Sequence, residues 1–175
     1  KNQHALLASA ADKGFDHIYA FKRSHIDPGF YQRHQKILSQ ETGAGYWLWK
    51  PYFILKVMEQ LPEGSLIFYA DSGIVFRDNI HKLIKKLQEV SLILVGHGTP
   101  APLKRHLKKE AYPFFRVPLT ETILNDENIW AFFIGIKNTE KNREFIRQWL
   151  AVCVQPEAIM NEPFDSKNQR NFLNN

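Results

Sequence analysis

Apolar positions along the chain recur with two spacings, one typical of helices and one typical of strands. Apolar residues three or four positions apart predict helices at residues 6–10, 51–61 and 80–90. Two further helices have predicted caps: Asp27 caps one that runs to about Gln40, and Asn138 or Thr139 caps one that carries the apolar residues at 145–150. Unbroken or alternating apolar runs predict four strands, at residues 17–21, 66–69, 92–95 and 131–136. Because strands alternate with helices, the pattern predicts a layered α/β sheet with right-handed crossovers.

The helix predicted from Pro51 to Leu61 and the strand after it determine where chemistry is expected. Proline suits the first turn of a helix, and the apolar residues that follow Pro51 recur with a period near 3.6. The unbroken apolar run at residues 66–69 is typical of a central strand that is buried on both faces. Asp71 is therefore expected just beyond the C-terminal end of a buried strand.

Size and composition indicate one globular domain. The chain has 175 residues, of which 44% are hydrophobic and 23% charged. The single cysteine, Cys153, excludes an intrachain disulfide and a thiolate metal cluster, which is typical of a reducing compartment, and its apolar neighbours predict that it is buried. No run approaches the roughly 20 apolar residues of a membrane span. We therefore expect a cytoplasmic protein, with at most peripheral contact with a membrane.

The net charge of +5 favours anionic partners, which include nucleotide diphosphates, acidic glycans, lipid head groups and nucleic acid. Positive charge is scattered among carboxylates, and neither a ribonucleoprotein signature nor a basic-zipper pattern occurs, so nucleic acid is not the expected partner. The lysines between Lys82 and Lys86 nevertheless keep one alternative open. That alternative is a non-catalytic basic module that binds nucleic acid or anionic lipid.

Asp71, Ser72 and Gly73 directly follow the apolar run at residues 66–69. In open α/β sheets ligands bind beyond the carboxyl ends of the strands, so an acidic residue there is well placed to act. A carboxylate with small neighbours leaves room for a hard divalent cation that also takes oxygens from a diphosphate. The same tripeptide suits a turn whose aspartate bonds to its own backbone.

Three large aromatic residues and a lysine stand just before Pro51, in the stretch GYWLWKP at residues 45–51. They precede a predicted helix N-terminus, and such a terminus attracts phosphate. Lys50 can offer a point charge to a diphosphate while an aromatic ring stacks on a base or a sugar. An aromatic plug beside a solvated lysine is the alternative interpretation.

Residues 43–73 resemble the motifs of a known enzyme family. GAGYWLWKP at 43–51 is followed by a predicted helix and then by LIFYADSG at 66–73. A G-x-G-Y-W-x-W-K-P block before a strand that ends in Y-x-D-[AS]-G is similar to the pattern of a GT-A glycosyltransferase family found in polysaccharide gene clusters and some viruses. Residues 9–16 and 128–131 are similar to weaker signatures of that family, so the resemblance spans most of the chain.

The resemblance implies a GT-A fold, in which a Rossmann-like mixed sheet is flanked by helices. It also implies a hexosyl- or pentosyl-type transferase that moves a sugar from a UDP- or GDP-linked donor to a glycan or another hydroxyl acceptor, in polysaccharide or glycan biosynthesis. On this pattern Trp49, Lys50, Asp71, Ser72 and Gly73 belong to the donor site. Asp71 is the expected contact of a Mn²⁺ or Mg²⁺ cofactor, although the family's Asp-x-Asp motif here keeps one carboxylate.

Four further residues are candidates from their positions in the sequence. Lys109 belongs to a basic cluster able to grip a diphosphate, and His97, between two glycines at a predicted strand end, is able to bind the metal. Asp126 and Glu127 precede a predicted strand and are candidate general bases toward an acceptor hydroxyl in an inverting reaction. The structural alternatives are a solvated helix face for Lys109, a loop histidine for His97, and capping or solvent exposure for Asp126 and Glu127.

Family members usually open with a strand and carry an Arg-His-Asp-Gln-like segment downstream. On that comparison residues 1–175 are expected to form a single GT-A-like domain without its first strand and without its C-terminal catalytic segment. A catalytically inactive relative that keeps the fold is a further alternative, because the second carboxylate of the metal motif is absent.

Overall fold

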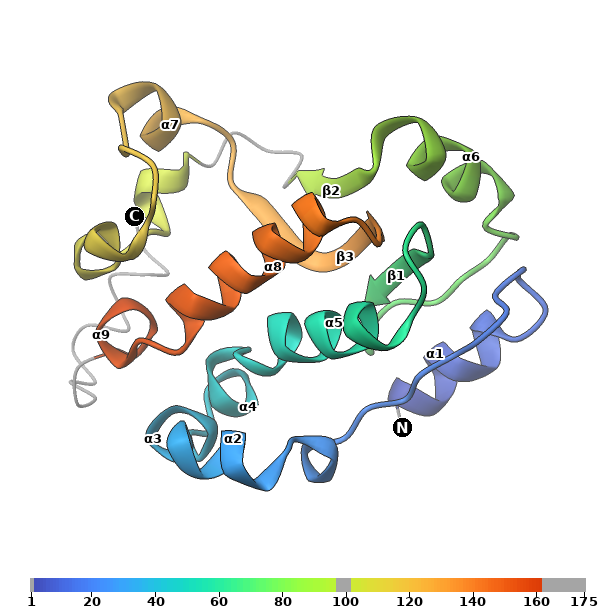
Figure 1. Ribbon diagram of the computed structural model, residues 1–175, viewed down its shortest axis with the longest axis horizontal. Helices are drawn as coiled ribbons and strands as arrows, with labels where there is room; N and C mark the ends of the chain where they lie inside the picture. Colours follow the sequence, from blue (N-terminus) through green and yellow to red (C-terminus); the bar gives the residue numbers. More distant parts are fainter. Residues whose placement is uncertain (1, 97–101, 162–175) are drawn as a thin grey trace.

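A small β-sheet lies at the centre of the molecule and is flanked by helices in the computed structural model, which describes residues 2–96 and 102–161 (Figure 1). The expectation of a mixed α/β fold is confirmed. The strands are β1 (Leu66–Ala70), β2 (Leu92–Gly96) and β3 (Ile129–Lys137). The α-helices are α1 (Asn2–Ala10), α2 (Pro28–Arg33), α3 (Gln35–Leu38), α4 (Gly43–Tyr46), α5 (Trp49–Gln60), α6 (His81–Val90), α7 (Glu121–Asn125), α8 (Glu140–Cys153) and α9 (Pro156–Ile159). Short 3₁₀-helices are η1 (Arg23–His25), η2 (Leu103–Arg105) and η3 (Lys109–Phe114).

The strand order differs from the expected layered sheet with a central β1. Among the described residues the order is β1-β3-β2, and both neighbours run antiparallel to β3. The pairing seen is therefore antiparallel, where a mixed sheet was expected, and β1 is an edge strand in which only Ile67 is buried. β2 is half-buried rather than buried. The C-terminal ends of β1 and β2 nevertheless lie at the same end of the sheet, on either side of β3, because both strands run opposite to β3.

One face of the sheet packs against α5 and α8, which lie side by side. The core on this face contains seven buried side chains, namely Ile54, Val57, Met58, Ile67, Ile134, Ile136 and Ile146. Thr139 caps α8 by accepting a hydrogen bond from the backbone N–H of Asn142, at 3.2 Å. Phe145, expected on the inner face of α8, is 40% exposed, whereas Ile146 is fully buried.

Cys153 is buried at the end of α8, as the sequence predicts. Burial raises the pKa of its thiol to about 12. No helix in the two described ranges has both the length and the apolar character needed to cross a membrane.

The segment predicted as a strand at residues 17–21 is extended but pairs with no strand in the described structure. The helix predicted from Asp27 to Gln40 is divided into α2 and α3, because His34 departs from helical φ and ψ angles. Asp27 caps α2 as expected, accepting from the N–H of Phe30 at 2.8 Å.

The glycines at 43–45 end the α3 region in a left-handed turn. Five consecutive residues, from Gly43 to Trp47, have φ angles between 50° and 102°. Gly45 has the largest of these angles, and a Cβ added there would lie 2.9 Å from Cα of Leu38. Only glycine fits this position, since both the backbone angle and the close approach exclude a side chain.

Replacing Gly45 by alanine is expected to lower the free energy of unfolding by about 3 kcal/mol, because the new methyl group meets backbone and not a flexible side chain. Gly64 is the matched control, since its φ is +87° with open space around it. Gly64→Ala should cost only about 1 kcal/mol, from the left-handed angle. Urea unfolding of both variants checks this, and equal losses would contradict the role assigned to the Leu38 contact.

Candidate functional site

Asp71 lies directly after β1 and is held by two donors from the protein interior. Its backbone N–H donates to the carbonyl of Phe132, which extends the pairing between β1 and β3 by one residue. The ammonium group of Lys50 lies 2.9 Å from Oδ2 of Asp71, and the hydroxyl of Tyr69 donates to Oδ1. Asp71 itself keeps 32% of its side chain exposed, so one part of the carboxylate faces solvent.

The expected turn is present, but it does not use the carboxylate. The N–H of Ile74 donates to the backbone carbonyl of Asp71, at 3.0 Å. The side chain of Asp71 points instead toward Lys50 and Tyr69. The interpretation that the Asp71 carboxylate bonds to the backbone of its own turn is therefore wrong.

Lys50 is buried, with 6% of its surface exposed, and is not the solvated lysine of the alternative interpretation. Lys50 is the second residue of α5, which begins two residues after the left-handed turn at residues 43–47. The ammonium also donates to the carbonyl of Ala131 at 2.9 Å and lies 5.7 Å from the ring centroids of Trp49 and Tyr69. A buried cation needs such partners, because its desolvation is costly.

The carbonyl of Ala131 is available because the pairing between β2 and β3 is interrupted there. Leu94 pairs with Ile134, but the next residue, Val95, pairs with Trp130. The three residues from Ala131 to Phe133 therefore have no partner on β2. A bulge of this kind redirects backbone groups and is common beside functional sites.

Tyr69 is the member of this cluster that the sequence analysis did not single out. Burial raises the pKa of the Tyr69 hydroxyl well above its usual range, and the adjacent Asp71 carboxylate raises it further. The hydroxyl therefore stays protonated at neutral pH and donates to Asp71. The spacing of residues 69 and 71 contained a signal, since alternate strand residues point to the same face.

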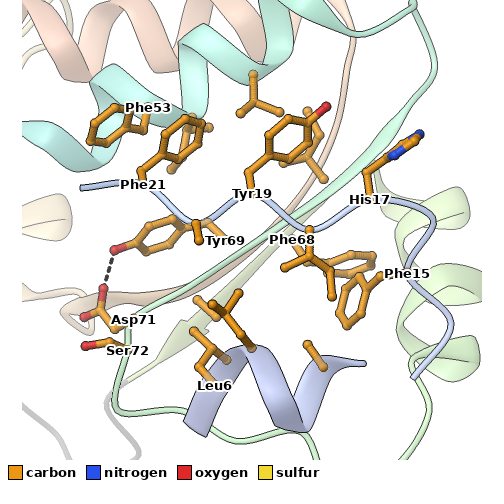
Figure 2. A pocket seen from close by; sticks show the side chains of 18 of the residues that line it. Leu6, Phe15, His17, Tyr19, Phe21, Phe53, Phe68, Tyr69, Asp71 and Ser72 are labelled. Carbon is orange, nitrogen blue, oxygen red and sulfur yellow. Dashed lines mark hydrogen bonds between the residues drawn. The ribbon is translucent and has the colours of Figure 1, made fainter. Parts of the chain in front are cut away.

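A cavity of about 790 Å³ opens beside this cluster (Figure 2). Its walls come from α1, residues 14–23, α5 and β1. Trp49, Asp71 and Ser72 line it, and Figure 2 places Asp71 and Ser72 at one end and Phe15 and His17 at the other. Gly73 is exposed just past that end. Of the residues expected at the donor site, Trp49, Asp71 and Ser72 thus line the cavity, whereas Lys50 does not line it and lies behind Asp71.

The other candidates lie elsewhere. Asp126 and Glu127 are exposed at the start of β3, and the Glu127 carboxylate packs against Gly96 at the end of β2. They lie at the same end of the sheet as Asp71 but do not line the cavity. Lys109 is exposed at the start of η3, whose contacts are with α8 and α9. His97 lies outside the described residues.

The donor set around Asp71 does not match what a divalent cation requires. Within residues 2–96 and 102–161, no three His, Cys, Asp or Glu side chains lie close enough together to hold an ion. Both oxygens of Asp71 already accept from Lys50 and Tyr69, and an ammonium 2.9 Å away would repel a metal ion at the same oxygen. The described residues therefore form a carboxylate neutralised by lysine and not a complete Mn²⁺ or Mg²⁺ site.

The buried hydroxyl of Tyr69 predicts a dependence of stability on alkaline pH. The unfolded chain loses this proton above pH about 10, whereas the folded protein keeps it, so Tyr69 makes the free energy of unfolding fall by about 1.4 kcal/mol per pH unit there. Tyr69→Phe should flatten the slope by that amount. Denaturant unfolding between pH 9 and 11.5 measures it, and the same slope in both proteins would contradict the burial of the hydroxyl.

Comparison of the chain with protein family models, with curated proteins and with solved structures gave no match.

Proposed function

We propose that this chain is a nucleotide-sugar-dependent glycosyltransferase of the GT-A type whose donor site surrounds Asp71. The observation that carries the proposal is a half-exposed carboxylate at the end of a strand, fixed by the buried ammonium of Lys50 and by the hydroxyl of Tyr69. A carboxylate held in one position before a ligand arrives binds hydroxyl groups at little ordering cost. Donor sugars and riboses present such hydroxyls.

The strand arrangement supports this placement. β1 and β2 run in the same direction, are joined through α6, and have their C-terminal ends at the same end of the sheet. Ligands of α/β proteins bind beyond the C-terminal ends of such strands. The left-handed turn at residues 43–47 adds support, since backbone in sparsely populated angles is concentrated at functional sites.

The proposed reaction is attack of an acceptor hydroxyl on the anomeric carbon of the donor sugar. The new bond joins the acceptor oxygen to that carbon, and the bond from the carbon to the diphosphate oxygen breaks, so the nucleoside diphosphate leaves with the electron pair. Asp71 and Ser72 orient the donor by hydrogen bonds at the cavity end. In an inverting reaction Asp126 or Glu127, on the same sheet edge, takes the proton of the acceptor hydroxyl.

The donor site is tested by thermal-shift titration with UDP- and GDP-linked sugars. A ligand bound only to the folded state raises the melting temperature, by about 5 °C or more at a hundredfold excess over Kd for a chain of this size. We expect one nucleotide class to give this shift and Asp71→Asn to lose it. Asp78→Asn, an exposed acid-to-amide change in the following loop, is the matched control and should keep the shift. Equal shifts in both variants would remove Asp71 from the donor site.

The same titration in EDTA and in Mn²⁺ addresses the metal. Because Lys50 already neutralises Asp71, we expect the donor-induced shift to persist in EDTA. A shift that appears only with Mn²⁺ would mean that Asp71 exchanges Lys50 for the ion when the donor binds.

A further inference from the structure

Two basic residues follow the extended segment at residues 17–21, just as Asp71 follows β1. Figure 2 shows that this segment and β1 run in the same direction, and that Phe21 and Asp71 lie at the same end of the cavity. Lys22 and Arg23 come directly after Phe21, and both line the cavity. The C-terminal ends of two extended stretches therefore bring two cations and a carboxylate to one end of the cavity, where ligands of α/β proteins bind.

The guanidinium group of Arg23 is held in place by uncharged groups. Its Nη2 atom donates to the carbonyl of Leu38 and to the hydroxyl of Tyr31, and its Cζ lies 5.5 Å from the centroid of the Tyr31 ring. In the described part of the chain, no carboxylate forms an ion pair with Arg23 or Lys22. The positive charge of Arg23 is therefore positioned by the protein without being neutralised, and the N–H groups on Nη1 and Nε stay available to a ligand.

The left-handed turn at residues 43–47 anchors both Arg23 and Trp49. The turn packs against Leu38, whose carbonyl accepts from Arg23. Within the turn, the carbonyl of Gly43 accepts from the indole N–H of Trp49 at 3.0 Å. Because both anchored residues line the cavity, the turn fixes a cation and an aromatic ring in its wall. A nucleotide presents the matching pair of groups, namely a charged phosphate chain and a flat base.

The balance of charge at this end of the cavity is positive. Among the residues that line the cavity, the acids are Asp16 and Asp71. Asp16 belongs to the opposite end, because its two neighbours in the sequence are labelled there in Figure 2. The charge of Asp71 is neutralised by Lys50, at 2.9 Å. The charges of the two basic residues are therefore left over, and an anion at this end would offset them.

We propose that Arg23, with the charge of Lys22 beside it, binds the diphosphate of the donor and takes the place of the metal ion that the residues around Asp71 do not fit. This assignment rests on the proposed glycosyltransferase function, because it names the residue that contacts the diphosphate of that donor. When the bond to the anomeric carbon breaks, the diphosphate keeps the electron pair and gains negative charge. The guanidinium of Arg23 stabilises this charge through charge-assisted hydrogen bonds.

Calorimetric titration with inorganic pyrophosphate, UDP and GDP, each in EDTA, tests the proposal. Arg23→Gln should weaken the binding of pyrophosphate and of the preferred nucleotide by at least about tenfold, because charge-assisted hydrogen bonds to phosphate are lost. Arg33→Gln is the matched control, since it removes the same charge from an exposed residue of α2 that does not line the cavity. At physiological ionic strength it should change these affinities by less than about twofold.

A second measurement uses the wild-type protein and so does not depend on the folding of a variant. In NMR spectra the Nε–H signal of Arg23 should shift on addition of pyrophosphate, and that of Arg33 should not. An unmoved Arg23 signal, or equal pyrophosphate affinity in Arg23→Gln and the wild type, would overturn the proposal. Sugar transfer that continues unchanged in Arg23→Gln would overturn it too, but would leave the glycosyltransferase function standing. Pyrophosphate binding through Arg23 in a protein that transfers no sugar would support the anion site and contradict the glycosyltransferase function.

Discussion

Asn138→Ala is expected to lower the free energy of unfolding by about 3 kcal/mol or more. The side chain is fully buried between β3 and α8. Its amide nitrogen donates to the carbonyls of Met58, Leu61 and Pro62 at 2.9 to 3.0 Å, so it satisfies the C-terminal end of α5. Alanine would leave these carbonyls without that donor. Urea unfolding at neutral pH measures the loss.

Two comparisons isolate the role of the Asn138 amide. Asn138→Asp keeps the shape and the oxygen that accepts from Arg143, but replaces the donor by an acceptor beside the three carbonyls, so it should also be destabilising. Thr139→Ala removes only the cap of α8 and should cost about 1 kcal/mol. A loss below about 1 kcal/mol for Asn138→Ala would show that other donors satisfy the end of α5.

Asp71→Ala is expected to destabilise the protein by about 2 to 3 kcal/mol, because it leaves the buried ammonium of Lys50 without its counter-charge. Because Asp71 is partly exposed, we expect this loss of stability to be smaller than the loss caused by breaking a fully buried ion pair. Lys50→Met should cost less, since the carboxylate left behind is able to reach water. The double variant should be more stable than Asp71→Ala alone, because no unpaired charge remains in the interior.

Denaturant unfolding of the wild type, both single variants and the double variant completes this thermodynamic cycle. A coupling energy of at least about 1.5 kcal/mol is expected for groups in direct contact. Strictly additive losses would contradict the ion pair between Lys50 and Asp71. The cycle tests the geometry of the site without knowledge of its substrate.

The sequence was sufficient for features that depend on local patterns. The α5 helix, the strand before Asp71 and the cap at Asp27 follow from periodicity, proline placement and capping chemistry, and the same chemistry limited the cap of α8 to Asn138 or Thr139. The position of Asp71 at a strand end was therefore predicted correctly. Local patterns also predicted that Cys153 is buried.

Features that depend on which segments meet in space were not predictable in the same way. An apolar run such as Leu66–Ala70 occurs both in central strands and in edge strands that face an apolar cavity. The sequence pattern therefore did not predict the edge position of β1. The burial of Lys50 was not predicted, because one of its partners, the carbonyl of Ala131, is 81 residues away and is made available by a bulge. The contact between Tyr69 and Asp71 is local, and only their spacing of two residues on one strand indicated it.

The most direct test of the glycosyltransferase proposal is transfer of a radiolabelled sugar from each UDP- and GDP-linked donor to a panel of glycan acceptors. The account predicts turnover with one nucleotide class, and a rate about 100-fold lower in Asp71→Asn, because an oriented contact to the donor is lost. Asp78→Asn should transfer at the wild-type rate. Full activity in Asp71→Asn, or a donor that binds without ever being turned over, would contradict the account.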